Sequence, residues 1–229
     1  MNNMNFVYIC RNGDNEELRY SIRSLYKNIN NPNIWIIGGK PVWYSGNYIE
    51  VNQNRTKHVN VRNNLNKLVT SNNIPNDFIL MNDDFFIMKP MIDIPYMHGG
   101  TLLDKIKKFK THAPASSYTK MLSDTYNLLI KKQIKNPLDY AIHVPIKMNK
   151  EKLSTVIYPS LSVRTMYGNL YEVGGEEIND VKVHLDRPWA ESFDYNKNSN
   201  FLSTNDKSFI KLFDDVLKNE FADKSPLEK

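Results

Sequence analysis

The sequence has only one cysteine, Cys10, in 229 residues, so it cannot form an internal disulfide or a four-cysteine zinc site. Such sparse use of cysteine suits a reducing compartment. The sequence also lacks an apolar run of about 18 residues, the length needed to cross a bilayer. Its first ten residues do not follow the pattern of a secretory signal. We therefore expect a cytoplasmic protein with no transmembrane segment.

An excess of acidic residues is also missing. Lys and Arg number 30 against 25 Asp and Glu, which gives a formal net charge of +5 and a pI near 9.0. This balance is compatible with an anionic partner but does not require one. The hydrophobic content of 41% is enough for a core, which argues against intrinsic disorder. We expect one domain at residues 1–222, followed by a disordered tail at 223–229.

Apolar runs and helical patterns alternate along the first half of the chain. This order favours an α/β fold with a mostly parallel central sheet flanked by helices. Asp14 and Glu17 have the spacing of a helix-capping box. The last predicted helix is amphipathic, and the sequence leaves open whether its apolar side packs on its own domain or on a second subunit. The expected strands lie at 6–10, 34–37, 78–81, 154–158 and 181–185, and the later expected helices lie at 60–71, 101–109, 117–134 and 205–221.

Three polar residues, Asn82-Asp83-Asp84, follow directly after the most apolar predicted strand. Ligands of open α/β sheets bind at the carboxyl ends of the strands. Two adjacent carboxylates repel each other there unless a cation compensates them, and Mn²⁺ or Mg²⁺ prefers such oxygen ligands. Asn82 and Asp84 lie two residues apart, so both point to the same side of an extended segment and are candidate metal ligands. The alternative interpretation is a surface turn or a helix cap.

Four segments in order resemble motifs of the Stealth family, the hexose-1-phosphate transferases of bacterial capsule synthesis that are related to N-acetylglucosamine-1-phosphotransferase. Phe78–Phe86 resembles the family's "ylNDDfF" signature, and Arg11–Leu25 resembles its "RDNdELRYSLRSi" segment. His143-Val144-Pro145, with Lys147 and Leu153, is similar to "HvP…k.l", and Arg164 matches an arginine after the next strand. The acidic "vDGsD" element that usually follows the first strand of the family is missing here.

This resemblance implies a GT-A-like fold that binds a nucleotide-sugar donor. Cations near the donor phosphates would neutralise the leaving group. His143 is a candidate general base for the acceptor hydroxyl, although an isolated histidine can also be purely structural. Arg19 and Arg23 share a helical face and would either line the site or form a solvated stripe. The candidate catalytic residues are Asp83, His143 and Arg164. The candidate cations for the donor phosphates include Arg11, Arg19, Arg23 and Arg62. Asn63 and Asn64 resemble an Asn pair upstream of the family's acidic cluster, which would hold the ribose or sugar of the donor.

A second, shorter resemblance lies near the C-terminus. Val183–Trp189 is similar to the "H-F-x-G-x-x-K-P-W" element of family-8 retaining glycosyltransferases, but it is one residue shorter and lacks the glycine. It implies His184 as a third metal ligand and Arg187 as a contact to the donor phosphates. The alternative is that His184 ends a strand and that the following Pro-Trp only packs.

The function that these patterns favour is transfer of a sugar, or a sugar-1-phosphate, from a nucleotide-sugar to an acceptor hydroxyl. A UDP-sugar is the expected donor, with a glycan or wall polymer, or a hydroxylated base in DNA as in phage-type glucosylation, as the acceptor. One alternative is a non-catalytic nucleic-acid-binding module that uses lysines on the helices at 101–109 and 117–134. Another is a Mg²⁺-dependent phosphodiesterase, with Asp186 as the best further carboxylate.

Overall fold

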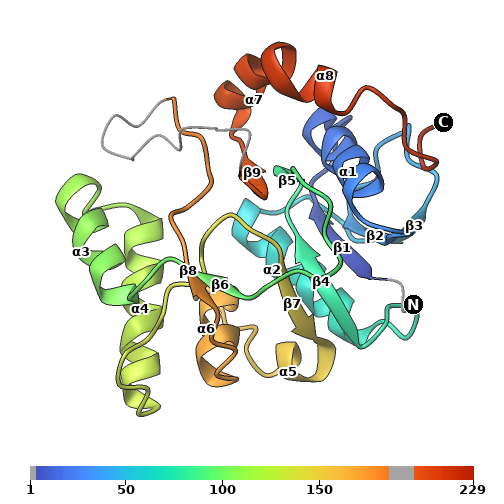
Figure 1. The fold of residues 1–229 in the computed structure, drawn as a ribbon. Coiled ribbons are helices and arrows are strands. Elements are labelled where there is room, and N and C mark those ends of the chain that lie inside the picture. Colours follow the sequence, from blue (N-terminus) through green and yellow to red (C-terminus); the bar gives the residue numbers. More distant parts are fainter. Residues whose placement is uncertain (1–3, 186–198) are drawn as a thin grey trace.

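A five-stranded sheet forms the centre of the computed structural model, which describes residues 4–185 and 199–229. The strand order is β3-β2-β1-β4-β7 (Figure 1). The first four strands run parallel, and β7 pairs antiparallel with β4 at the edge. The carboxyl ends of the parallel strands therefore lie along one border of the sheet. The strands are β1 (Asn5–Cys10), β2 (Asn33–Gly38), β3 (Asn47–Glu50), β4 (Asp77–Met81) and β7 (Ile146–Asn149).

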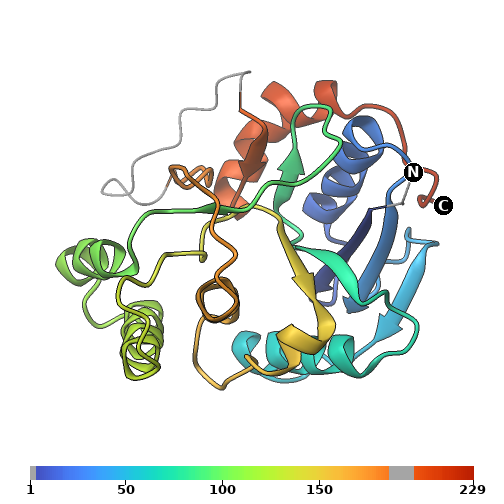
Figure 2. The ribbon, with the colours of Figure 1, turned by 60° about the horizontal axis from the view of Figure 1, so that its bottom comes forward.

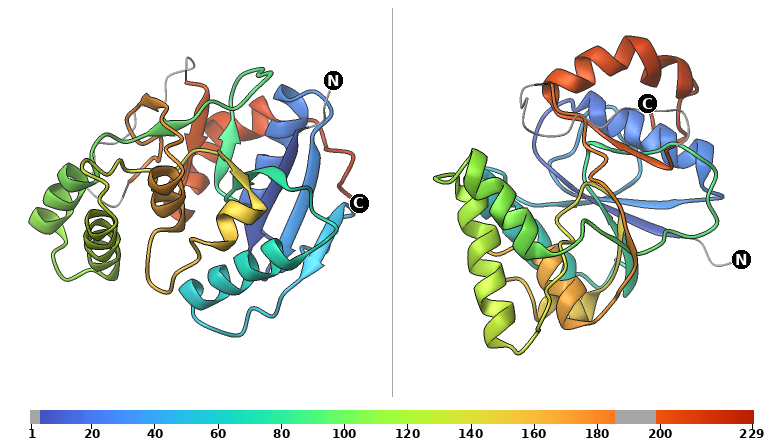
Figure 3. Two further views of the ribbon diagram at one scale, coloured as in Figure 1. Left: turned by 90° about the horizontal axis from the view of Figure 1, so that it is seen from below. Right: turned by 60° about the vertical axis from the view of Figure 1, so that its left-hand side comes forward.

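Side chains alternate across the two faces of the sheet, and each face carries its own core. In β1, Phe6 and Tyr8 belong to a cluster that includes the apolar side of α1 (Glu16–Asn28). Val7 belongs to a second cluster together with the apolar side of α2 (Lys57–Thr70). Figure 3 shows α1 and α2 on opposite faces of the sheet. This is the strand–helix alternation that the sequence predicts, and the predicted α/β fold class is confirmed.

Smaller elements surround the sheet. The helices α3 and α4 pack against each other and project from one side of the molecule (Figure 2). None of the helices in the described ranges is long and apolar enough to cross a bilayer. The remaining elements are β5 (Phe85–Ile87) paired with β9 (Phe201–Ser203), β6 (Met97–His98) paired with β8 (Glu176–Glu177), α3 (Leu102–His112), α4 (Ser117–Lys131), α5 (Lys150–Ser154), α6 (Val163–Leu170), α7 (Asp206–Leu212), the π-helical turn η1 (Phe213–Leu217) and α8 (Lys218–Glu220).

The apolar stripe of the C-terminal helix packs within its own chain. A third core cluster joins Leu217 of η1 and Phe221 to Tyr20 of α1 and Phe86 of β5. Figure 1 shows α7 and α8 beside α1. The predicted helix at 205–221 is present as one unbroken helical run at residues 206–220, with a π-helical turn in the middle. Of the two alternatives that the sequence leaves open, its own domain or a second subunit, the apolar side of this helix therefore packs on its own domain.

Two predicted strands are wrong. Residues 154–158 are not a strand, because the Asn149 side chain accepts hydrogen bonds from the amides of Glu151 and Lys152 and so starts the helix α5. Its end is followed by a turn, despite the β-branched residues there. Residues 181–185 are extended, but only Lys182 forms an isolated bridge, to Ser203.

The predicted helix cap and the predicted disordered tail also need correction. Asn15, and not Asp14, caps α1, because its Oδ1 accepts a hydrogen bond from the amide of Leu18 at 3.1 Å. The tail predicted to be disordered at 223–229 packs on the molecule. Glu228 forms a buried ion pair with Arg23 at 2.6 Å, and the amide of the last residue donates to the carbonyl of Trp43.

Candidate active site

The acidic triplet lies where β4 ends at the carboxyl border of the sheet. The amide of Phe85 donates to the carbonyl of Asn82 at 3.3 Å, which closes a tight turn around Asp83 and Asp84. Phe85 then enters the core as the first residue of β5. The apolar residues on both sides of the triplet fix the turn between two buried strands, as the sequence predicts.

The two carboxylates of the turn have different partners. Asn15, at the start of α1, donates from Nδ2 to Asp83 Oδ2 at 2.7 Å. Lys182 Nζ lies 2.6 Å from Asp84 Oδ2, and both side chains are nearly closed to solvent. The other oxygen of Asp84, Oδ1, is buried and has no hydrogen-bond partner among the residues that the structure describes. A buried carboxylate oxygen without a donor is unfavourable unless a cation or another donor reaches it.

A third carboxylate adds to the negative field at this turn. Glu17, on the first turn of α1, is buried and accepts a hydrogen bond from Thr204 Oγ1 at 3.0 Å. Burial, together with the charges of Asp84 and Asp83, raises the pKa of Glu17 to about 7. Burial and the charge of Asp84 also raise the pKa of Asp83. The turn therefore favours the approach of positive charge.

The residues present fit a divalent cation only when donor phosphates complete the coordination. In the described ranges, no group of three or more His, Cys, Asp or Glu residues is arranged to hold a metal by itself. Mg²⁺ commonly takes one or two carboxylates and fills its other positions with water and substrate phosphates. Asp84 Oδ1, with Asp83 and Asn82 beside it, matches that smaller donor set. The predicted third ligand, His184, is not brought into a three-ligand group.

His143 lies next to this turn and is held by an aspartate. Its Nδ1 is 2.9 and 2.8 Å from the two carboxylate oxygens of Asp180, and its amide also donates to Asp180 Oδ1. The His143 ring meets the ring of Phe85 edge-on, with centroids 6.2 Å apart. The base candidate thus contacts Phe85, the residue that directly follows Asp84 in the chain.

Arg164 also contacts the ring of Phe85. Its guanidinium lies 5.3 Å from the centre of the Phe85 ring and donates to the carbonyl of Val144. Burial lowers the pKa of Arg164 to about 10, although the charges of Asp180 and Asp84 act in the opposite direction. His143 and Arg164 therefore both contact Phe85, which directly follows Asp83 and Asp84, and the catalytic roles of these residues stay predictions.

The predicted donor-binding residues lie in different parts of the structure. Arg11 follows β1, is two-thirds exposed, and contributes a charge that lowers the pKa of Asp83, so it lies at the site. Arg23 is occupied elsewhere by its buried ion pair with Glu228. Arg19 pairs with Glu16 at 3.0 Å and stacks on Trp43.

The three candidates on α2 lie along a different part of the border. Asn64 is buried, and its amide group bonds to the carbonyl of Cys10 and to Gln53, so it joins the end of β1 to the loop that follows β3. Asn63 lines a groove between the end of β3 and α2, and Arg62 is half-buried on the same helix. Arg187 and Asp186 lie outside the described residues.

Several residues of the site were not singled out by the sequence analysis. Asp180 and Lys182 hold His143 and Asp84, and Asn15 holds Asp83. The alternation of buried Val181 and Val183 around Lys182 indicates that Lys182 points to the opposite side of its segment, but it does not indicate toward what.

Solved glycosyltransferase structures share this fold. The apo structure of the bifunctional glycosyltransferase WbbM superposes with a TM-score of 0.60 and 13% identity, covering 97% of this chain and 50% of that one. The galactosyltransferase LgtC, in complex with donor and acceptor sugar analogues, gives a TM-score of 0.50 and 8% identity over 99% of this chain and 98% of that one. The chain spans about half the length of WbbM. No protein-family model matches the sequence, and no curated protein matches it significantly.

These likenesses define the class of the fold. It is the GT-A-type glycosyltransferase fold, with the acidic turn at the carboxyl border of its parallel strands. At these low identities, the comparisons show the fold alone.

Proposed function

We propose that this protein is a metal-dependent transferase that takes a nucleotide-sugar, most simply a UDP-sugar, and transfers the sugar or sugar-1-phosphate to an acceptor hydroxyl. One observation supports this proposal above the others. Asp84 Oδ1, a buried carboxylate oxygen with no hydrogen-bond partner in residues 4–185 and 199–229, lies at the border of the sheet where open α/β folds bind ligands, and the fold is of the GT-A type.

In this proposal, Asp84 and Asp83, with Asn82, hold Mn²⁺ or Mg²⁺ together with the donor diphosphate. The ion, when bound, supplies positive charge that stabilises the leaving phosphate. Arg11, exposed at the end of β1, and Arg164 are positioned to add further positive charge near the same turn. His143 accepts the proton of the acceptor hydroxyl.

The Stealth-like motifs favour transfer of a sugar phosphate, and the His184 element favours simple glycosyl transfer. The motifs around His143 and Arg164 lie at the site, whereas His184 does not join a ligand group. We therefore place the sugar-phosphate reaction first among the two.

Isothermal titration of UDP-sugars with and without Mn²⁺ tests the proposal. We expect binding that depends on Mn²⁺ and that weakens roughly tenfold or more in Asp84→Asn, because a carboxylate ligand is lost. Asp93→Asn is the matched control. Asp93 also pairs with a lysine, Lys147, at 2.8 Å, but that pair is exposed and is not part of the site. The proposal fails if no UDP-sugar binds, or if both variants behave like the wild type.

The acceptor is tested separately. A glycan acceptor is favoured over DNA, because the basic helices α3 and α4 neutralise part of their own charge. Lys107 pairs with Asp104 and Lys120 with Asp124, while Lys105 is buried against Asp139. We expect no tight binding to duplex DNA at about 50 mM salt, where phosphate contacts are strongest. Binding below about 1 µM at that salt would instead favour a DNA acceptor.

A further inference from the structure

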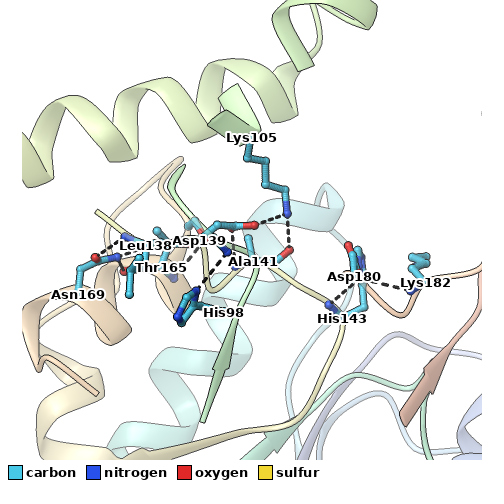
Figure 4. A network of polar contacts seen from close by, with 12 residues as sticks. His98, Lys105, Leu138, Asp139, Ala141, His143, Thr165, Asn169, Asp180 and Lys182 are labelled. Atoms are coloured by element: carbon cyan, nitrogen blue, oxygen red, sulfur yellow. Dashed lines mark hydrogen bonds and ion pairs between the residues drawn. The ribbon is translucent and has the colours of Figure 1, made fainter. Parts of the chain in front are cut away.

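Asp180, which belongs to none of the sequence motifs, bonds to His143. It lies on the segment that follows β8, and three donor groups of the chain form hydrogen bonds with it. Both of its oxygens contact His143 Nδ1, and its Oδ1 also accepts from the amides of His143, at 3.1 Å, and Lys182, at 3.3 Å. Figure 4 shows Asp180 between the two residues. The carboxylate is therefore fixed in position by the backbone, and it fixes the imidazole in turn.

The charges around this pair keep Asp180 ionised. Burial by itself would raise its pKa, but the neighbouring His143 and Lys105 hold the pKa of Asp180 well below its usual range. Arg164, on α6, adds a further positive charge toward the same carboxylate. Lys105 is shared with Asp139, which it contacts at 2.6 Å (Figure 4). An ionised carboxylate on Nδ1 requires the proton of the neutral imidazole to be on Nδ1.

The remaining ring nitrogen, Nε2, is then the basic one. All hydrogen bonds that the ring makes within the described ranges go through Nδ1. The His143 side chain is 27% exposed, so a substrate hydroxyl can reach it. The same segment continues to Lys182, whose Nζ contacts Asp84. Asp180 thus sets the orientation of the base relative to the acidic turn.

We propose that Asp180 is the positioning residue for His143, and that the pair activates the acceptor hydroxyl in the transferase reaction proposed above, on which this inference rests. The hydroxyl proton moves to Nε2 while the acceptor oxygen forms its new bond to the transferred group. The bond from that group to the nucleotide breaks, and its electron pair stays on the departing nucleotide phosphate. Asp180 stabilises the imidazolium that forms, which later returns its proton to water.

Asp180→Asn keeps the shape but removes the charge, and its effect on the reaction should be specific. We expect kcat to fall roughly 100-fold or more, with little change in the Kd of the nucleotide-sugar, because the pair acts on the acceptor. In a His143→Gln background, the same substitution should have almost no further effect on kcat.

Nitrogen-15 NMR of the histidine rings tests the arrangement without any substrate. We expect neutral His143 to carry its proton on Nδ1 in the wild type, and Asp180→Asn to weaken that preference, because the side-chain amide can also donate to Nδ1. Asp139→Asn is the control, because it removes a carboxylate from the same network without touching His143, and it should leave the tautomer unchanged. A wild-type ring protonated on Nε2, or the same tautomer ratio in wild type and Asp180→Asn, would overturn the inference. These spectra decide it even if no nucleotide-sugar proves to be a donor, which would refute only the proposed function.

Discussion

Lys182 neutralises a carboxylate that is almost closed to water, and that position determines what its removal should do. Its side chain is 14% exposed and that of Asp84 is 13% exposed. Removing one partner of a buried pair leaves an uncompensated charge, which costs about 3 kcal/mol. We therefore expect Lys182→Met to lower the melting temperature substantially in the absence of metal.

Mn²⁺ should recover part of that loss, because a cation can then take the place of the ammonium group beside Asp84. In thermal melts at about 1 mM MnCl₂, we expect a larger upward shift for Lys182→Met than for the wild type. Lys147→Met removes the exposed pair with Asp93 and is the control, for which Mn²⁺ should add no extra stability. An equal Mn²⁺ shift in all three proteins would mean that the ion does not take the place of the ammonium group beside Asp84.

Glu17 makes the stability of the fold depend on pH in the neutral range. Its pKa in the folded state is about 7, above the value near 4.3 of an unfolded chain, because burial and the two aspartates disfavour its charge. Between these values the folded state binds more protons than the unfolded state, so stability falls as the pH rises. Glu17→Gln should remove this slope. The free energy of unfolding of the variant, relative to the wild type, should therefore be higher at pH 8 than at pH 5 by on the order of 1–2 kcal/mol.

Urea denaturation at pH 5 and pH 8 measures this difference. Glu151→Gln, a change at an exposed glutamate, is the comparison and should leave the slope as it is in the wild type. A Glu17→Gln variant with an unchanged slope would show that Glu17 is ionised in the folded state throughout this range.

The acidic turn is predictable from sequence, but the residues that complete the site are not. Asp83 and Asp84 follow a strand that is recognisable from its own apolar residues, so a local pattern is sufficient. Lys182 lies 98 residues further along the chain than Asp84. Its contact depends on the bridge to Ser203 and on the pairing of β5 with β9, which bring three distant segments together. No local spacing encodes that arrangement.

At the scale of elements, Gly38 marks the place where β1, β2 and α2 meet most closely. Its φ is +119°, and a Cβ there would lie 2.1 Å from the carbonyl oxygen of Cys10 and 2.6 Å from Asn64 Nδ2. Gly38→Ala therefore combines backbone strain with a collision against a neighbouring strand. We expect a loss of about 3 kcal/mol or more in the free energy of unfolding.

Gly174→Ala separates the two causes. Gly174 also has a positive φ, +61°, but nothing lies within 4 Å of the position of its Cβ. This variant should lose only about 1 kcal/mol. Similar losses in the two variants, measured by chemical denaturation, would mean that the end of β2 can move away from β1 without much cost.

The helices α1 and α2 and the strands β1, β2 and β4 follow from local patterns, because each one buries a regular apolar stripe. The strand β3 was not predicted, because none of its residues is buried and it is defined by its pairing with β2. The later half is less predictable for a physical reason. Its strands are two to four residues long, and β6, β8 and β9 exist only through pairing with distant segments. The segment at 154–158 has β-branched residues, but it pairs with no strand in the described ranges.

At the scale of the whole molecule, two ion pairs join the C-terminal region of the chain to α1. Arg23 contacts Glu228 in a pair whose side chains are 8% and 3% exposed, and Lys27, one turn later, contacts Glu220 in a pair that is nearly half exposed. Both pairs fasten the C-terminal region to the same helix. They differ mainly in burial, so they provide a matched comparison.

Glu228→Gln should destabilise the protein by about 3 kcal/mol, because Arg23 then keeps its charge in a buried position without a counter-ion. Glu220→Gln should cost no more than about 1 kcal/mol, since water screens the exposed pair.

Burial tends to raise the pKa of Glu228, but its bonds with Arg23 lower it below the usual value. The contribution of Glu228 is therefore present above about pH 4.3 and is lost as the pH falls through its lower folded pKa. In urea denaturation, the gap between wild type and Glu228→Gln should stay constant from pH 5 to 8 and narrow below about pH 4. Equal losses in the two variants would show that the C-terminal segment is held by its apolar contacts, through Phe221 and its neighbours, and that the buried ion pair adds nothing to them.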